Sequence, residues 1–199
     1  MAHQVVPMLC ILKKNSKLHT VFNLQEQNNN TVKDMTPFPD QDIIHNDMAR
    51  SAYRSKLNMS KAYEQIRIIP EHIHKMAFAT VLGTFRSQVM QMGDCNTPST
   101  FQQLMTASFQ ECISQFVHVY LDDIFIYSCS IKEHKKHLGI VFQRLRDHHF
   151  FLSKSKVDLY SKRLECLSHI IDDRGIHVNT DKMQCICEWR RPRMFNDMQ

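Results

Sequence analysis

The chain has 199 residues, of which 43% are hydrophobic and 23% charged, the composition of a globular protein that can bury a substantial core. No apolar run approaches a membrane span, and the N-terminus lacks a basic region followed by an apolar core, so we expect an intracellular, non-secreted protein with no membrane partner. The formal net charge of +5 suits a polyanionic partner such as nucleic acid, although a mildly basic solvated surface explains it equally well.

The first half of the chain alternates apolar runs with turn residues, which predicts short strands and one helix. Asp40 can cap a helix that runs to about Arg50, with Ile43, Ile44 and Met48 on one face. The polar residues from 25 to 33 predict a loop. The strands that we expect here span residues 5–13, 18–22, 53–57, 65–69, 76–80 and 84–90.

The second half predicts longer helices and further short strands. Pro98 suits the first turn of a helix over residues 97–112, with an apolar stripe that we expect in the core: Phe101, Leu104, Met105 and Phe109. Ser130 and Glu133 form a capping box for a helix to about residue 148, with an inward face of Leu138, Val141 and Leu145. Strands are expected over 116–120, 124–127, 155–160, 164–171 and 175–178, and a last helix over 180–189. Because helices and strands do not alternate strictly, the pattern predicts an α+β fold with an antiparallel sheet.

Two polar motifs each allow two interpretations. Asp122 and Asp123 stand between two β-prone runs, either as an ordinary turn or as carboxylates that hold a divalent cation beside a dry core. His134 and His137, three apart on a helix, could bind a metal, but without a third ligand at fitting spacing a solvated helix face is the simpler interpretation.

Four stretches together resemble the boxes of reverse transcriptases. Tyr120-Leu-Asp-Asp123 between apolar strands is similar to the catalytic box, and residues 55–68 to the box that carries the first catalytic aspartate. Residues 92–102, which end in Pro-Ser-Thr-Phe-Gln, resemble the (A/S)-P-x-x-F-Q segment. Residues 166–171, Cys-Leu-Ser-His-Ile-Ile, resemble the primer-grip hairpin. In order and spacing, the chain resembles the polymerases of gypsy-like LTR retrotransposons from about residue 5 to residue 193.

The resemblance implies a right-hand polymerase fold. The fingers would comprise about 1–52 and 69–96, the palm about 53–68 and 97–178, and the start of the thumb about 179–199. Most of the thumb is then absent, and the remaining thumb, RNase H and integrase would belong to the rest of a Pol polyprotein in intact relatives.

The resemblance also implies an activity, RNA-directed DNA polymerisation by two Mg²⁺ ions held on bridging carboxylates. Asp122 and Asp123 would be catalytic metal ligands, with position 58 as the third. The partners would be an RNA or DNA template–primer and dNTPs. The nucleotide-binding residues would be Tyr63, Met92, Gly93, Lys13, Lys14 and His19. The primer grip would be Leu167, Ser168 and His169.

The chain departs from the family pattern at the third carboxylate, where it has Asn58. Loss of a unit charge beside a divalent ion costs on the order of several kcal/mol, so we expect impaired catalysis. Other departures are Ser16, His19, Asn23 and Gln25 in the fingers and Ser168 in the primer grip. At each of these positions, one G-to-A nucleotide change converts a codon for the family's residue into one for the residue found here. This leads to the hypothesis that the chain is a copy decayed by mutation. The alternatives are a non-enzymatic nucleic-acid-binding remnant and a bare structural domain.

Overall fold

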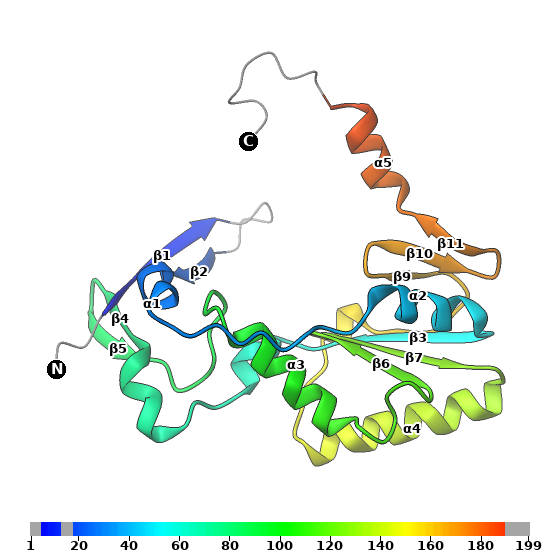
Figure 1. Cartoon of the computed structure of the whole chain (residues 1–199), viewed down its shortest axis with the longest axis horizontal. Coiled ribbons are helices and arrows are strands. Elements are labelled where there is room, and N and C mark those ends of the chain that lie inside the picture. Colours follow the sequence, from blue (N-terminus) through cyan, green and yellow to red (C-terminus); the bar gives the residue numbers. More distant parts are fainter. Residues whose placement is uncertain (1–4, 13–17, 190–199) are drawn as a thin grey trace.

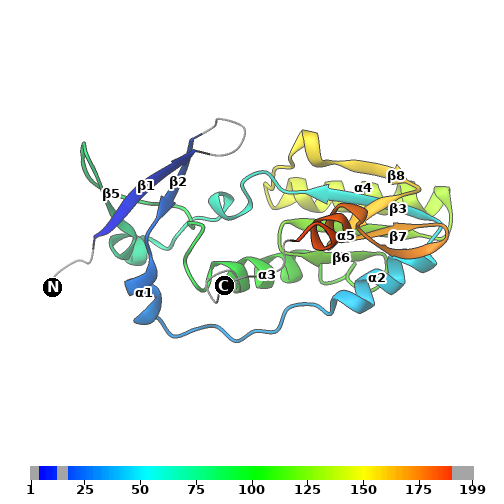
Figure 2. The same ribbon diagram turned by 90° about the horizontal axis from the view of Figure 1, so that it is seen from above.

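The computed structural model describes residues 5–12 and 18–189, which form three sheets with helices packed between and around them (Figure 1). A sheet built mainly from the N-terminal region lies at one end of the molecule, and a larger body around a central sheet lies at the other. An extended segment before α2 runs between the two (Figure 2). Among the described helices, none has both the length and the apolar character needed to cross a bilayer.

The central sheet is antiparallel, with the strand order β6-β7-β3-β8. Its strands are β3 (Tyr53–Asn58), β6 (Val117–Tyr120), β7 (Asp123–Ser128) and β8 (Asp158–Ser161). In β7, Ile124 and Ile126 pack into one hydrophobic cluster while Phe125 and Tyr127 pack into another. Because successive strand residues point to opposite faces, this apolar run buries both faces of the sheet.

Two helices, α3 (Thr97–Ser108) and α4 (Ile131–Asp147), cover one face of the central sheet (Figure 1). Of the expected apolar stripe on α3, Phe101, Met105 and Phe109 are fully buried, but Leu104 is only partly buried. Helix α3 also ends at Ser108 instead of residue 112, and Phe109 is its C-cap. The predicted capping box at the start of α4 is confirmed, as is its inward face of Leu138, Val141 and Leu145.

On the opposite face lie α2 (Gln41–Arg50) and a small antiparallel sheet of β9 (Leu164–Cys166), β10 (His169–Asp172) and β11 (Gly175–Val178). Asp40 caps α2 as expected, accepting from Asp42 N at 2.8 Å. Of the expected apolar face, Ile44 and Met48 are buried, but Ile43 is 53% exposed, so that part of the prediction is wrong.

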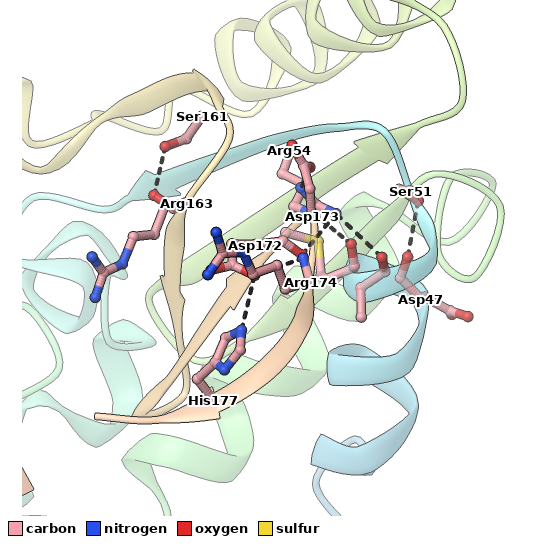
Figure 3. A network of polar contacts seen from close by, with 11 residues as sticks. Asp47, Ser51, Arg54, Ser161, Arg163, Asp172, Asp173, Arg174 and His177 are labelled. Atoms are coloured by element: carbon pink, nitrogen blue, oxygen red, sulfur yellow. Dashed lines mark hydrogen bonds and ion pairs between the residues drawn. The ribbon is translucent and has the colours of Figure 1, made fainter. Parts of the chain in front are cut away.

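Arg54 on β3 connects these layers through a network of polar contacts (Figure 3). Its guanidinium is buried and donates to the carbonyls of Met48 and Ala49 at the end of α2. It also donates to the carbonyl of Asp172 and to the carboxylate of Asp173 in the β10–β11 turn. One side chain therefore ties the central sheet to α2 and to the small sheet.

The third sheet has the order β2-β1-β4-β5, with β1 (Val6–Leu12), β2 (Leu18–Phe22), β4 (Ala77–Thr80) and β5 (Gly83–Arg86). β1 pairs antiparallel with β2 and β4 with β5, and the parallel pairing of β1 with β4 joins the two pairs. The 3₁₀ helix η2 (Pro70–Met76) precedes β4. Helix α5 (Thr180–Cys187) follows the small sheet, close to the expected last helix.

Four of the predicted segments differ in secondary structure. Residues 25–33 were expected as a loop but begin with the short helix α1 (Gln25–Asn29), followed by a turn. Residues 65–69 form no strand: the 3₁₀ helix η1 (Ala62–Gln65) comes first, and Arg67 makes a single bridge to Val89. The expected strand over 164–171 is split by a turn into β9 and β10, and residues 155–160 divide into the 3₁₀ helix η3 (Lys154–Lys156) and the start of β8.

Candidate active site

Asp122 and Asp123 lie at the tip of the β6–β7 hairpin, which the sequence located correctly. The preceding residue, Leu121, has a left-handed backbone with φ of +51°. From α3, the buried side chain of Gln102 accepts from Leu121 N at 2.8 Å and donates to the carbonyl of Val119 at 3.0 Å. Gln102 thereby fixes a strained hairpin tip on a helix of the core.

Asn58 lies directly opposite Asp123 in the β3–β7 register, so the three residues meet as the motifs predicted. Its side-chain nitrogen Nδ2 donates to Asp122 Oδ2 at 2.9 Å and to Asp123 Oδ1 at 2.7 Å. Nearby, the backbone N–H of Met59 donates to the carbonyl of Asp122 at 2.9 Å. One amide group therefore bridges both carboxylates.

Lys56, also on β3, supplies the opposite charge. Its Nζ lies 3.0 Å from Asp123 Oδ2, and both side chains are about one-fifth exposed, at 22% and 18%. The same ammonium lies 5.5 Å from the ring centroid of Phe125. We refer below to Lys56, Asn58, Asp122 and Asp123 as the carboxylate cluster.

Tyr63 belongs to the same region. Its ring packs edge-on against Phe101 at a centroid distance of 5.4 Å. Burial, followed by the negative charge of Asp122, raises the pKa of its hydroxyl, which keeps the side chain neutral beside the carboxylates.

Met92 and Gly93 lie in the loop before α3, where Met92 is 62% exposed. Gly93 has φ of +108°, a conformation that favours glycine, and its carbonyl accepts from Asn28 Nδ2 at 2.8 Å. The structure thus places Gly93 against α1. His19 is paired with Ile11 in the N-terminal sheet through the backbone, and Lys13 and Lys14 lie outside the described residues.

Of the expected primer-grip residues, Leu167 and Ser168 form the turn between β9 and β10, and His169 is the first residue of β10. Leu167 and Ser168 both have positive φ values, +44° and +74°. The ring of His169 packs edge-on against His45 of α2 at 4.6 Å, and His45 Nε2 lies 3.1 Å from the carbonyl of Cys166. The turn is therefore docked on α2.

The His134 and His137 pair does not match the predicted solvated face. His134 is fully buried, with Nε2 2.7 Å from Ser55 Oγ and Nδ1 2.9 Å from Ser128 Oγ. Burial, with the neighbouring His137 second, lowers the pKa of His134 to about 4, so it is a neutral core residue. Within the described ranges, no group of three or more His, Cys, Asp and Glu side chains could hold a metal ion.

Comparison with known proteins decides the family. The family model described as "Reverse transcriptase (RNA-dependent DNA polymerase)" matches residues 8–192. The chain belongs to the reverse transcriptase family.

Relatives of this reverse transcriptase domain include polyproteins of retrotransposons. It is 31% identical over 188 residues to the retrovirus-related Pol polyprotein from transposon 297 of Drosophila melanogaster, covering 94% of this chain and 18% of that protein. It is 26% identical over 193 residues to the transposon Tf2-3 polyprotein of Schizosaccharomyces pombe, covering 97% of this chain and 14% of that protein. The chain thus spans less than a fifth of these relatives.

Solved structures show the same fold. The foamy viral protease-reverse transcriptase in complex with double-stranded DNA has a TM-score of 0.89 and 20% identity, covering 98% of this chain and 34% of that chain. The same viral protein in complex with an RNA/DNA hybrid has a TM-score of 0.86 and 19% identity, covering 98% of this chain and 26% of that one. The α+β expectation of right-hand polymerase fingers and palm is confirmed.

Within this reverse transcriptase fold, sequence reasoning missed two residues of the site. Gln102 was considered only as the end of a motif, although it stands three residues before Met105 and so shares a helix face with the apolar stripe, which was a usable indication of its burial. Lys56 was read as part of a strand, and its ion pair with Asp123 depends on a cross-strand register that the sequence does not show.

Proposed function

We propose that this chain is the fingers and palm of a gypsy-like retrotransposon reverse transcriptase, an RNA-directed DNA polymerase whose nucleotidyl transfer is impaired in this copy. The observation that carries the proposal is the position of Asn58. It lies where the resemblance implies a third carboxylate, and its amide donates to both Asp122 and Asp123. An amide cannot contribute the negative charge that a pair of divalent ions requires.

The side chains at the site determine whether the implied Mg²⁺ ions fit there. Two carboxylates supply hard oxygen ligands, but Asn58 Nδ2 and Lys56 Nζ bind oxygens of the same carboxylates. Because a two-ion centre needs several bridging carboxylates, this set of side chains does not fit one.

The remaining residue roles belong to the same proposal. Tyr63 would contact the sugar of an incoming dNTP, and its packing on Phe101 beside the charge of Asp122 supports that role. Five residues of the fingers would contribute to nucleotide binding: Met92, Gly93, His19, Lys13 and Lys14. The Leu167–His169 segment would contact the primer, supported by its docking on α2.

The proposed partners are an RNA or DNA template–primer, dNTPs and the rest of a Pol polyprotein. The basic net charge and the fold shared with nucleic-acid-bound viral enzymes support nucleic acid as a partner. The proposed fingers span 1–52 and 69–96, the palm 53–68 and 97–178, and the start of the thumb 179–199. Relatives among retrotransposon polyproteins support an intracellular setting, in the cytoplasm or nucleus.

Binding of a labelled RNA template–DNA primer at several salt concentrations tests the proposal. We expect the affinity to fall steeply with salt, because each neutralised phosphate releases counterions. The logarithm of the association constant plotted against the logarithm of the salt concentration should have a slope of about −3 or steeper. A chain that shows no salt-sensitive binding would be only a structural domain, and the proposal would fail.

Primer extension by the same chain, first with Mg²⁺ and then with Mn²⁺, separates an impaired polymerase from a remnant. The proposal predicts slow but measurable nucleotide addition with at least one of the two metals. Binding without addition in either metal would favour the non-enzymatic nucleic-acid-binding remnant instead.

A further inference from the structure

Three of the four carboxylate oxygens at the hairpin tip have cationic or polar side-chain partners within the protein. Asp123 Oδ1 accepts from Asn58 Nδ2, and Asp123 Oδ2 is paired with Lys56 Nζ at 3.0 Å. Asp122 Oδ2 accepts from the other hydrogen of the same amide. A pair of adjacent carboxylates beside a dry core is costly unless it is compensated, and here two side chains of β3 compensate it.

The orientation of the Asn58 amide follows from the chemistry of its neighbours. Ionised carboxylates can only accept hydrogen bonds, so the nitrogen must face Asp122 and Asp123 when no cation lies between them. For a metal to use the amide oxygen, the group would have to flip and break both hydrogen bonds. A bound cation would also compete with Lys56 for Asp123.

The backbone holds this arrangement in place. The Asn58 carbonyl accepts from Ser153 N at 2.8 Å, and Met59 N donates to the Asp122 carbonyl. Asn58 is only 7% exposed and is paired in the β3–β7 ladder, so its side chain has little freedom to withdraw. The cluster is therefore a fixed part of the central sheet.

We propose that Lys56 and Asn58 take the place of divalent cations in this chain, so that the carboxylate cluster is stable without metal and disfavours metal binding. The inference goes beyond the proposed function because it concerns folding and metal affinity, not the polymerase reaction. It also predicts the reverse: a third carboxylate at position 58 would make the stability of the fold depend on a divalent cation.

Thermal unfolding of the 199-residue chain in EDTA and in millimolar MgCl₂, at matched ionic strength, tests the proposal. We expect the wild-type Tm to agree within about 1 °C between the two conditions. Asn58→Asp should unfold at least about 3 °C lower in EDTA and recover in MgCl₂, because three carboxylates then face one another. Titration with Mn²⁺ should show at least about tenfold tighter binding by Asn58→Asp than by wild type.

Two matched variants control for the chemical changes themselves. Asn46→Asp makes the same substitution at an exposed position of α2 and should leave the Tm independent of Mg²⁺. Lys56→Gln should acquire Mg²⁺-dependent stability, whereas Lys61→Gln, from an exposed ion pair with Glu64, should not.

The proposal is overturned if Mg²⁺ stabilises the wild type as much as Asn58→Asp, or if Asn58→Asp shows no dependence on metal. Should Asn58→Asp fail to fold in either condition, Lys56→Gln decides, since an unchanged response to Mg²⁺ in that variant would also overturn the proposal. Polymerase activity is measured separately, so failure of the proposed function would be distinguishable from failure of this inference.

Discussion

Gln102 Oε1 lies 2.8 Å from the backbone nitrogen of Leu121, the residue just before the two aspartates. Through its other amide atom, the same side chain donates to the Val119 carbonyl. The helix α3 thus holds the hairpin tip by hydrogen bonds at two backbone positions. Since Leu121 has a left-handed conformation, these bonds stabilise a backbone that would otherwise relax.

Gln102→Leu should lower the free energy of unfolding by about 2–4 kcal/mol, because two buried backbone groups lose their partners. Urea denaturation measures the loss. Gln103→Leu is the matched control, since the exposed Gln103 bonds only to Asp34 and Thr36 and should cost about 1 kcal/mol or less. Equal losses in the two variants would contradict the role assigned to Gln102.

Arg54→Met should lower the free energy of unfolding by about 3–5 kcal/mol, because the carbonyls of Met48, Ala49 and Asp172 lose a buried charged donor (Figure 3). Asp173→Asn should cost about 1 kcal/mol or less, because the Asp173 side chain is 65% exposed. Thermal unfolding of both variants separates the two contributions. A larger loss for Asp173→Asn would show that the ion pair, not the carbonyl contacts, is the main stabilising interaction.

Local patterns predicted those elements whose ends carry their own hydrogen-bonding residues. Helix α2 begins after Asp40 and α4 after Ser130, each with the expected side-chain cap. Helix α1 was missed because its stability comes from distant contacts. Asn28 bonds to Gly93 O and Cys95 N, more than sixty residues away. The alternation of Ile66 and Ile68 resembled a strand, but Arg67 between them makes only one bridge.

The sequence predicted which residues form the candidate site, but not the contacts between their side chains. Motif order located Asn58, Asp122 and Asp123, and the register of β3 with β7 brings them together. The bridging amide of Asn58 and the ion pair of Lys56 required coordinates, because side-chain direction and cross-strand register decide both. The buried His134 was missed because a helix face alone does not show what packs on it.

His134 should make the protein less stable in mild acid. Its folded-state pKa of about 4 lies below the ordinary value of 6.5, so protonation favours the unfolded chain. The stability is complete above pH 6.5 and falls as the pH decreases towards 4, by about 3 kcal/mol in total. In urea denaturation across this range, the free energy of unfolding should fall less steeply with decreasing pH for His134→Gln than for the wild type, because glutamine does not titrate. The same slope in both proteins would mean that His134 is not the responsible group.

Ser168→Gly should stabilise the turn between β9 and β10. Ser168 has φ of +74°, a conformation that costs a residue with a side chain about 1–2 kcal/mol. Glycine avoids this cost, but its greater conformational freedom in the unfolded chain offsets part of the stabilisation. We expect a net increase of about 0.5–1 kcal/mol in the free energy of unfolding. Ser168→Ala keeps the Cβ atom and should give no increase. A gain with alanine but not glycine would exclude backbone strain as the cause.

The most direct test of the central claim is single-nucleotide incorporation on an RNA template–DNA primer with Mg²⁺, comparing the chain with its Asn58→Asp variant. Restoring one negative charge beside the two aspartates should recover several kcal/mol of transition-state stabilisation, so the variant should react at least about a thousandfold faster. Equal rates in the two proteins, whether measurable or absent, would contradict the claim that Asn58 is what limits this active site.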